Sequence, residues 1–198
     1  MHSPIIYIIE KGTEYVESLG GQLPDENQLF EETLLDCIEE SDWLVANTIE
    51  YSSWHRNQWD ESFEDMFKAN SYYNFKVTEK GIMELSILHH NLINWDKRLL
   101  ELHEEYNELL KNNLKENKFT SAFPYRDIKN YFEYKDMVEK ESGGIKFVLY
   151  QDYAGELEFY GVFNTRDLVE HAKRTFEFKN TNTIEFQICT NVVGDYHF

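Results

Sequence analysis

The spacing of hydrophobic and polar positions along this chain predicts a mixture of strands and helices. Residues 4–9, Pro-Ile-Ile-Tyr-Ile-Ile, are β-branched and aromatic, which predicts a short buried strand. A helical turn or two is expected over residues 14–19. Apolar side chains then recur at helical spacing, which predicts a helix over residues 25–40. Possible capping serines favour further helices over residues 41–58 and 62–68.

Large apolar side chains repeat every three or four positions in the middle of the chain, which is the spacing of a heptad seam. The seam predicts one long helix from about residue 78 to about residue 116, roughly 57 Å in length. Such a helix forms either the spine of a bundle within the chain or a coiled coil with a second copy. The bundle is favoured because the seam spans only just over three heptads. The seam residues are Leu85, Leu88, Leu92, Trp95, Leu99, Leu102, Tyr106 and Leu109.

The last third of the chain has a different pattern. Ser-Gly-Gly at residues 142–144 is a break typical of a boundary. Beyond it, residues 145–150 and 156–163 are expected to form the two strands of a hairpin. A helix over residues 165–176 and a last strand over residues 183–190 are expected to follow. The order β, β, α, β predicts a small α+β unit.

These elements together predict an α+β fold class. We expect an N-terminal helical bundle that contains the long helix of about residues 78–116, and a small C-terminal β-β-α-β unit. The corresponding domains are an acidic, mainly helical domain over residues 1–120 and a small α+β domain over residues 121–198 that packs against it.

Composition indicates a folded chain in a reducing compartment. Apolar residues make up 41 % of the sequence and aromatic residues 16 %, which argues against intrinsic disorder. The two cysteines, Cys37 and Cys189, form no CxxC motif, so a reduced setting is the simplest interpretation. The apolar run near the start is too short for a signal peptide, and no later run approaches about 18 apolar residues. We therefore expect a cytoplasmic protein without membrane association, in the host cytoplasm if a phage encodes it.

Charge is distributed unevenly along the chain. The first 66 residues hold 16 acidic side chains against two basic ones, Lys11 and Arg56, whereas the remainder holds 21 acidic and 17 basic side chains. Like charges four residues apart on one helix, such as Glu32 and Asp36, destabilise it by about 0.2–0.5 kcal/mol. A basic partner would relieve this repulsion, so the expected partner is a basic protein.

The expected partner-binding residues are two acidic patches with aromatic anchors between them, because tyrosine and tryptophan are the preferred anchors of protein interfaces. An acidic coat that only keeps an aromatic-rich chain in solution stays open as the simpler alternative. The predicted partner-binding residues are Glu31, Glu32, Asp36, Glu39, Glu40, Asp42, Tyr51, Trp54, Trp59, Asp60, Glu61, Glu64 and Asp65.

Sequence motifs of catalysis are absent. The chain has no HExxH, no phosphate-binding GxxxxGK[ST], no GxGxxG and no GxSxG motif. Three histidines, His89, His90 and His103, fall within the predicted long helix. Adjacent residues of a helix point in different directions, so His89 and His90 cannot both bind one metal ion. We therefore predict no catalytic residue, no metal and no cofactor.

In composition and size the chain resembles the loose class of nucleic-acid mimics, among them phage antirestriction and anti-CRISPR inhibitors. The resemblance implies a non-enzymatic inhibitor that occupies the basic nucleic-acid-binding groove of a nucleic-acid enzyme and does not itself bind nucleic acid. Three alternatives stay open. They are an immunity or antitoxin protein that neutralises a basic toxin, a metal-dependent hydrolase with a histidine and carboxylate site in the bundle, and a homodimer built on the seam of residues 85–109.

Overall fold

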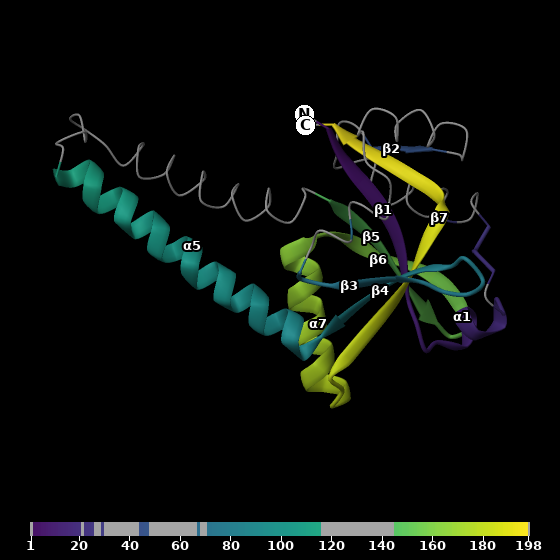
Figure 1. Cartoon of the computed structure of the whole chain (residues 1–198). Helices are drawn as coiled ribbons and strands as arrows, with labels where there is room; N and C mark the ends of the chain where they lie inside the picture. The colour runs from purple at the N-terminus through teal and green to yellow at the C-terminus, as the bar shows by residue number, and fades with distance from the viewer. Residues whose placement is uncertain are drawn as a thin grey trace.

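Strands dominate the fold. The computed structural model describes residues 2–20, 22–25, 29, 44–47, 67, 71–115 and 145–197. Within these residues, a mixed sheet has the strand order β3-β4-β7-β1-β5-β6, and a further strand, β2, pairs with β7 (Figure 1). The strands are β1 (His2–Glu10), β2 (Leu44–Asn47), β3 (Asn74–Val77), β4 (Met83–Leu88), β5 (Lys146–Tyr153), β6 (Glu156–Asn164) and β7 (Thr183–His197), and the helices are α1 (Glu14–Ser18), α5 (His89–Lys115) and α7 (Thr165–Lys179).

The predicted N-terminal helical bundle is therefore wrong. The strand expected over residues 4–9 is confirmed as β1, and it lies at the centre of the sheet, parallel to β5 and antiparallel to β7. Residues Ile5 to Ile9 are all 0–1 % exposed, so both faces of the strand are covered. A strand that is apolar on both sides needs strand partners and two covering layers. Its strand partners, β5 and β7, come from the carboxyl-terminal half of the chain.

Successive residues of the strands face two separate cores, one on each side of the sheet. On one side, Ile6, Phe147 and Phe186 pack under α5 and α7. On the other side, Tyr7 and Tyr150 pack with Val16 of α1. The sheet is thus the middle layer of the described molecule, and strands from both sides of the predicted domain boundary share it. The boundary near residue 120 falls outside the described residues and stays a prediction.

The long helix begins eleven residues later than the heptad spacing predicted. Residues 83–88 form β4, in which Leu85 and Ile87 are buried on the α5 side of the sheet. The start of α5 is fixed by Asn91, whose Oδ1 accepts a hydrogen bond from the Leu88 backbone N–H at 2.9 Å. From there α5 runs outward from the sheet for 27 residues (Figure 1), a length of about 40 Å.

The elements of the carboxyl-terminal third agree with the sequence pattern. The hairpin is formed by β5 and β6, and α7 and β7 follow in the predicted order. The helix α7 begins after Asn164, whose side chain accepts a hydrogen bond from the Asp167 backbone N–H, and it ends at Asn180 in the left-handed conformation. These two caps explain the bounds of α7.

The helices predicted between residues 25 and 68 lie mostly outside the described residues. Where the range 41–58 is described, at β2, the chain is a strand that pairs with the end of β7, so a continuous helix over that range is wrong. The short helix expected at residues 14–19 is confirmed as α1, with Thr13 as its cap.

Candidate functional site

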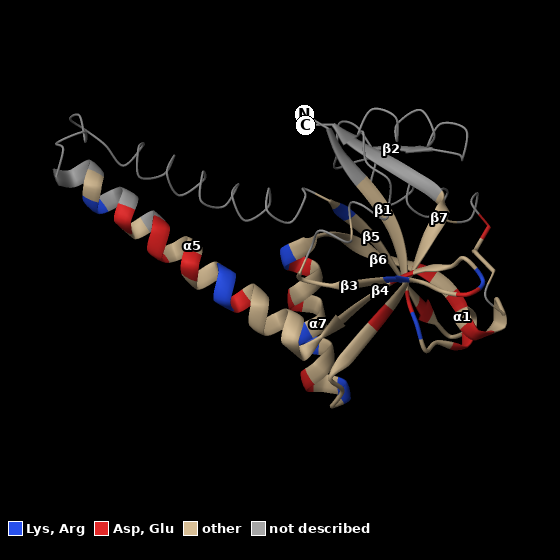
Figure 2. Ribbon diagram, viewed as in Figure 1, with Lys and Arg blue, Asp and Glu red and all other residues tan. Residues whose placement is uncertain are grey.

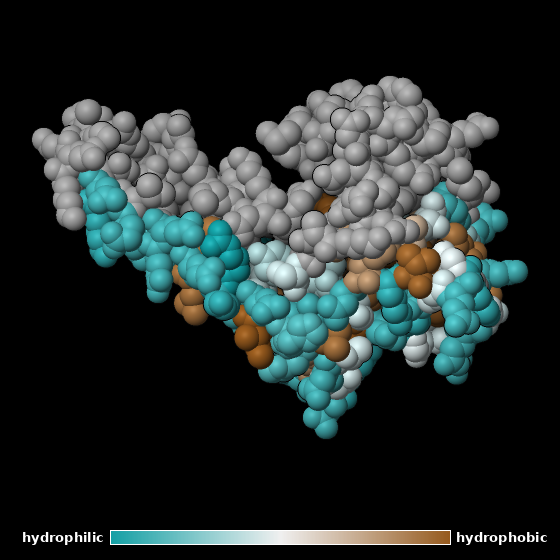
Figure 3. Space-filling model, viewed as in Figure 1, coloured by the Kyte–Doolittle hydropathy of each residue, from teal (hydrophilic) through white to brown (hydrophobic). Residues whose placement is uncertain are grey.

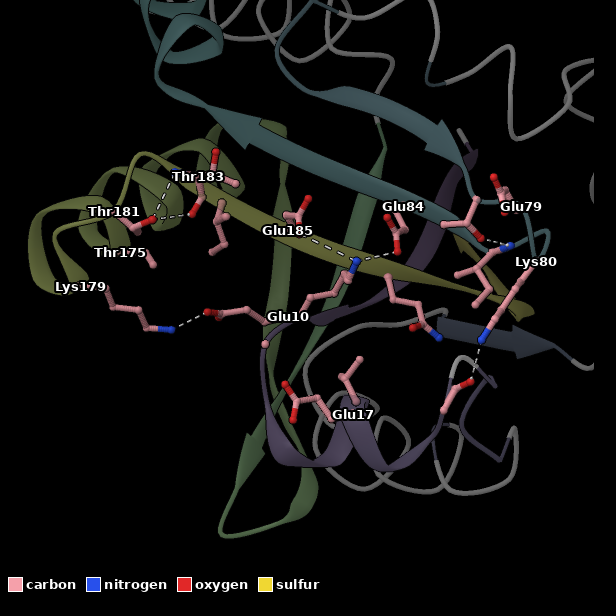
Figure 4. A pocket seen from close by; sticks show the side chains of 18 residues that line it. Glu10, Glu17, Glu79, Lys80, Glu84, Thr175, Lys179, Thr181, Thr183 and Glu185 are labelled. Atoms are coloured by element: carbon pink, nitrogen blue, oxygen red, sulfur yellow. Dashed lines mark hydrogen bonds and ion pairs between the residues drawn. The ribbon is translucent and has the colours of Figure 1, made fainter.

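A cavity of about 1090 Å³ lies where β1 ends and β7 begins. Charged side chains surround it, from β1, β4, β7 and the end of α7 (Figure 4). Two of its carboxylates, Glu10 and Glu84, are only 5 % and 6 % exposed. Charged side chains are seldom buried so deeply unless they are paired, so the partners of these two carboxylates define the chemistry of the cavity.

Glu84 of β4 is held between two lysines on the α1 side of the sheet. Its Oε1 lies 2.6 Å from Lys11 Nζ, and its Oε2 lies 2.8 Å from Lys76 Nζ. Glu185 of β7 stands next to the same two lysines, at 3.8 Å and 3.6 Å. Burial acts to raise the pKa of Glu84, but the two lysines outweigh burial, and the pKa lies below its usual value.

Glu10, the last residue of β1, has a separate set of partners on the α7 side of the sheet. Lys179 Nζ lies 2.6 Å from one carboxylate oxygen, and Gln151 Nε2 donates to the other at 2.9 Å. His171 Nε2 lies 3.6 Å from that second oxygen. Burial acts to raise the pKa of Glu10, but the contacts from His171, Lys179 and Gln151 are stronger and lower the pKa to about 2.

The arrangement favours fixed charge over acid–base chemistry. A carboxylate with a pKa of about 2 has no proton to give near neutral pH, so Glu10 is not suited to act as a general acid. Both buried carboxylates are already bound to cations of the chain itself. In the part of the chain that the structure describes, no group of three or more His, Cys, Asp or Glu side chains is arranged to hold a metal ion.

Replacing Glu84 with glutamine should lower the free energy of unfolding by about 1–2 kcal/mol, because a buried charge-assisted interaction with two lysines is lost. The matched control is Glu79→Gln, which removes an exposed carboxylate from the turn before β4 and should change stability by less than about 0.5 kcal/mol. Urea unfolding of both variants at neutral pH measures the difference. Equal stability of the two variants would contradict a stabilising role for Glu84.

None of the residues predicted to bind a partner lies within the described part of the chain, so their placement stays a prediction. They are Glu31, Glu32, Asp36, Glu39, Glu40, Asp42, Tyr51, Trp54, Trp59, Asp60, Glu61, Glu64 and Asp65.

The other residues considered from the sequence are described in part. His89, His90 and His103 are all exposed on α5. Cys189 is fully buried as a free thiol in β7, and burial raises its pKa. It therefore has little thiolate character, and reactive cysteines require the thiolate. Cys37 lies outside the described residues.

Sequence reasoning missed Glu10 and Glu84. The only local signal is that each stands in or directly after an apolar strand segment, which is an unusual place for a carboxylate. Their partners lie far away along the chain: 73 residues separate Lys11 from Glu84, and 169 residues separate Glu10 from Lys179. No spacing rule connects positions that far apart.

Comparisons with protein-family models, with curated protein sequences and with solved structures give no match for this chain. Among the described helices, none is long and apolar enough to span a lipid bilayer.

Proposed function

We propose that this protein is a non-enzymatic acidic inhibitor that binds the basic nucleic-acid-binding groove of a nucleic-acid enzyme, in the manner of anti-CRISPR or antirestriction nucleic-acid mimics. The observation that carries the proposal is the charge of the first 66 residues, with 16 acidic and two basic side chains. Enzymes that hold nucleic acid present lysine and arginine to its phosphates. A protein surface with many carboxylates carries the same sign of charge as those phosphates and can therefore bind in such a groove.

The ion pairs of the described residues support this proposal. Many lysines and arginines of the described chain already contact carboxylates that are themselves described, and Figure 2 shows both charges interspersed along α5 and α7. Each of these cations therefore has a described carboxylate partner that is not part of the acidic segment of residues 26–65. The cations with such partners are Lys11, Lys76, Lys97, Arg98, Lys111, Arg166, Lys173 and Lys179.

The first experiment identifies the partner and tests whether nucleic acid competes with this protein for it. The purified protein, immobilised at low salt, is used to capture proteins from a host lysate, and the retained protein is purified. Double-stranded DNA and RNA are then tested for displacement of the complex. The proposal requires that a nucleic-acid enzyme is retained and that nucleic acid competes with the inhibitor. A single toxin that nucleic acid does not displace would instead identify an immunity or antitoxin protein.

Affinity for that enzyme should depend on salt and on the predicted acidic patch. Raising the salt concentration from about 50 mM to about 200 mM should weaken binding by about tenfold or more, because several exposed charge pairs are screened. The triple variant Glu32→Lys, Asp36→Lys, Glu39→Lys should weaken binding at least as much.

A matched control separates the patch from net charge. The triple variant Glu79→Lys, Glu104→Lys, Glu177→Lys makes the same change in net charge at exposed positions that form no ion pair with the described residues. It should retain most of the affinity. Equal losses in both triple variants would mean that only total charge matters, and no loss in either would rule out the proposed mode of binding.

A further inference from the structure

A second cavity, of about 590 Å³, lies between the edge strand β6 and the helix α7. This volume is within the range of about 300–1,000 Å³ that small-molecule sites occupy. The strand contributes Tyr160 and Phe163, and successive turns of the helix contribute Arg166, His171 and Arg174. The cavity is thus formed by two elements whose relative position is fixed by the sheet and the core below α7.

Aromatic rings form one wall of this cavity. Tyr160 and Phe163 are stacked, with ring centroids 5.9 Å apart and an interplanar angle of 6°. His171 lies against both rings, at 5.5 Å and 5.8 Å, and its Nε2 faces Glu10. Phe178 lines the same cavity and is 90 % exposed, and Tyr160 is 54 % exposed. On the face seen in Figure 3, the described surface is mostly hydrophilic, so two exposed rings beside one cavity indicate a contact surface.

Among the described residues that line the cavity, one cation has no ion pair with another described residue. Asp167 is paired with Arg166 at 3.3 Å, and Glu170 is paired with Lys173 at 3.2 Å. Lys179 is bound to Glu10. Arg174 is exposed and makes no ion pair with any described residue. In a chain of net charge −18, a guanidinium that pairs with no described carboxylate, beside a cavity with an aromatic wall, is suited to bind an anion.

We propose that the cavity between β6 and α7 binds a small monocarboxylate with an aromatic body. The guanidinium of Arg174 pairs with the carboxylate, because the two groups match in a bidentate geometry. The ring of the ligand lies against Tyr160 and Phe178, where stacking and burial of apolar surface add to the affinity. This site is independent of the acidic inhibitor function, since it uses none of the residues assigned to that function.

The charge balance favours one negative charge on the ligand. The guanidinium of Arg174, which pairs with no described carboxylate, neutralises one carboxylate of a ligand. A phosphate dianion would bring a second negative charge close to Asp167 and Glu170, which also line the cavity. A positively charged ligand would be repelled by Arg174. The chemical class is therefore a monoanion on an aromatic ring, and a nucleotide is expected to bind more weakly.

Four small probes and a nucleotide test the proposal by NMR titration of the full-length protein. Phenylacetate carries both the ring and the carboxylate, acetate carries only the carboxylate, 2-phenylethanol carries only the ring, and phenethylamine carries the ring with a positive charge. Phenylacetate should shift the resonances of β6 and α7 and bind about tenfold more tightly than each of the other three probes. Adenosine monophosphate should also bind more weakly than phenylacetate.

The variant Arg174→Gln should weaken phenylacetate binding by about tenfold and leave binding of 2-phenylethanol unchanged. The matched control is Lys97→Gln, which removes one positive charge from the exposed surface of α5 and should leave both affinities unchanged. A second variant, Tyr160→Ser, should weaken both ring-bearing probes. Unchanged unfolding midpoints for the variants show that each remains folded.

Three outcomes would overturn the assignment. In the first, phenylacetate and 2-phenylethanol bind equally. In the second, no probe shifts the resonances of β6 and α7. In the third, Arg174→Gln leaves phenylacetate binding unchanged. Tighter binding of adenosine monophosphate than of phenylacetate would replace the monocarboxylate by a phosphate ligand. None of these outcomes bears on the inhibitor function, which is tested with the enzyme captured from a lysate.

Discussion

Replacing Trp95 with alanine is expected to lower the free energy of unfolding by about 3–5 kcal/mol, the usual cost of truncating a large buried aromatic side chain. Trp95 is 1 % exposed and packs edge-on against Tyr72, with ring centroids 4.7 Å apart and an interplanar angle of 89°. It belongs to the core under α5 and α7, together with Leu92 and Leu102 of the same helix. The truncation therefore removes a large apolar contact between α5 and this core.

Two further variants make this expectation specific. Trp95 Nε1 is buried and has no hydrogen-bond partner within the described part of the chain. Trp95→Phe keeps an aromatic ring and removes that donor, so it should cost less than about 1.5 kcal/mol. The surface control Leu100→Ala, at a position 66 % exposed on the same helix, should change stability by less than about 0.5 kcal/mol. Urea unfolding followed by circular dichroism measures all three, and a small loss in Trp95→Ala would show that α5 is anchored by other contacts.

The second large effect is a loss of stability in acid that depends on Glu10. Its pKa is about 2 in the folded protein, against an ordinary value of 4.5 for a glutamate side chain. A carboxylate whose pKa is lowered by folding stabilises the protein above its unfolded pKa, and this contribution is lost as the pH falls toward the folded pKa. At about 1.4 kcal/mol for each pKa unit, the contribution is on the order of 3 kcal/mol at neutral pH.

The variant Glu10→Gln isolates that contribution from the other carboxylates of this acidic chain. The difference in unfolding free energy between the natural protein and the variant should be largest above about pH 5 and should shrink steadily toward pH 2. Glu158→Gln, which removes an exposed carboxylate from neighbouring β6, should show no such convergence. Urea titrations at a series of pH values provide the measurement. A difference that does not change with pH would mean that the contacts of Glu10 stabilise the fold without depending on its charge.

Local patterns in the sequence predicted many of the elements. Pro-Ile-Ile-Tyr-Ile-Ile is confirmed as part of β1, and the hairpin, α7 and β7 are confirmed in order. Each of these depends on short-range information, such as β-branched runs or the caps of α7. The arrangement of the elements could not be predicted in this way, because it depends on contacts between residues far apart along the chain. In the pairing of β1 with β5, for example, Ile5 lies opposite Lys146.

The heptad seam shows how a periodic pattern can mislead. Leu85 and Leu88 continue the spacing of Leu92 and Trp95, yet they belong to a strand, where Leu85 is buried and Leu88 is half-buried. The alternation of Leu85 and Ile87 is the correct signal for that segment. The three- and four-residue spacing of the leucines coincides with this alternating pattern by chance. Residues 83–88 form a strand because they pair with β7. The seam residues Leu92, Trp95 and Leu102 are buried within the chain.

The candidate cavities were harder to predict from the sequence than the strands. No sequence motif contains Arg174, Tyr160 or Glu10. They are recognised as cavity residues only when the fold places α7 next to β6 and the end of β1. Charge, by contrast, can be read without a fold. The acidic first third of the chain therefore gave a functional hypothesis, although the residues concerned lie outside the described structure.

The central position of β1 has a consequence for biosynthesis. Its hydrogen-bonding neighbours, β5 and β7, begin at residues 146 and 183, so a nascent chain leaving the ribosome holds this apolar strand without either neighbour until residue 146 has been added. Contacts so distant along the chain also make folding slow. Until β7 emerges, the exposed Ile-Ile-Tyr-Ile-Ile segment is a ready substrate for chaperones, and the acidity of the residues that follow it opposes aggregation of the waiting chains.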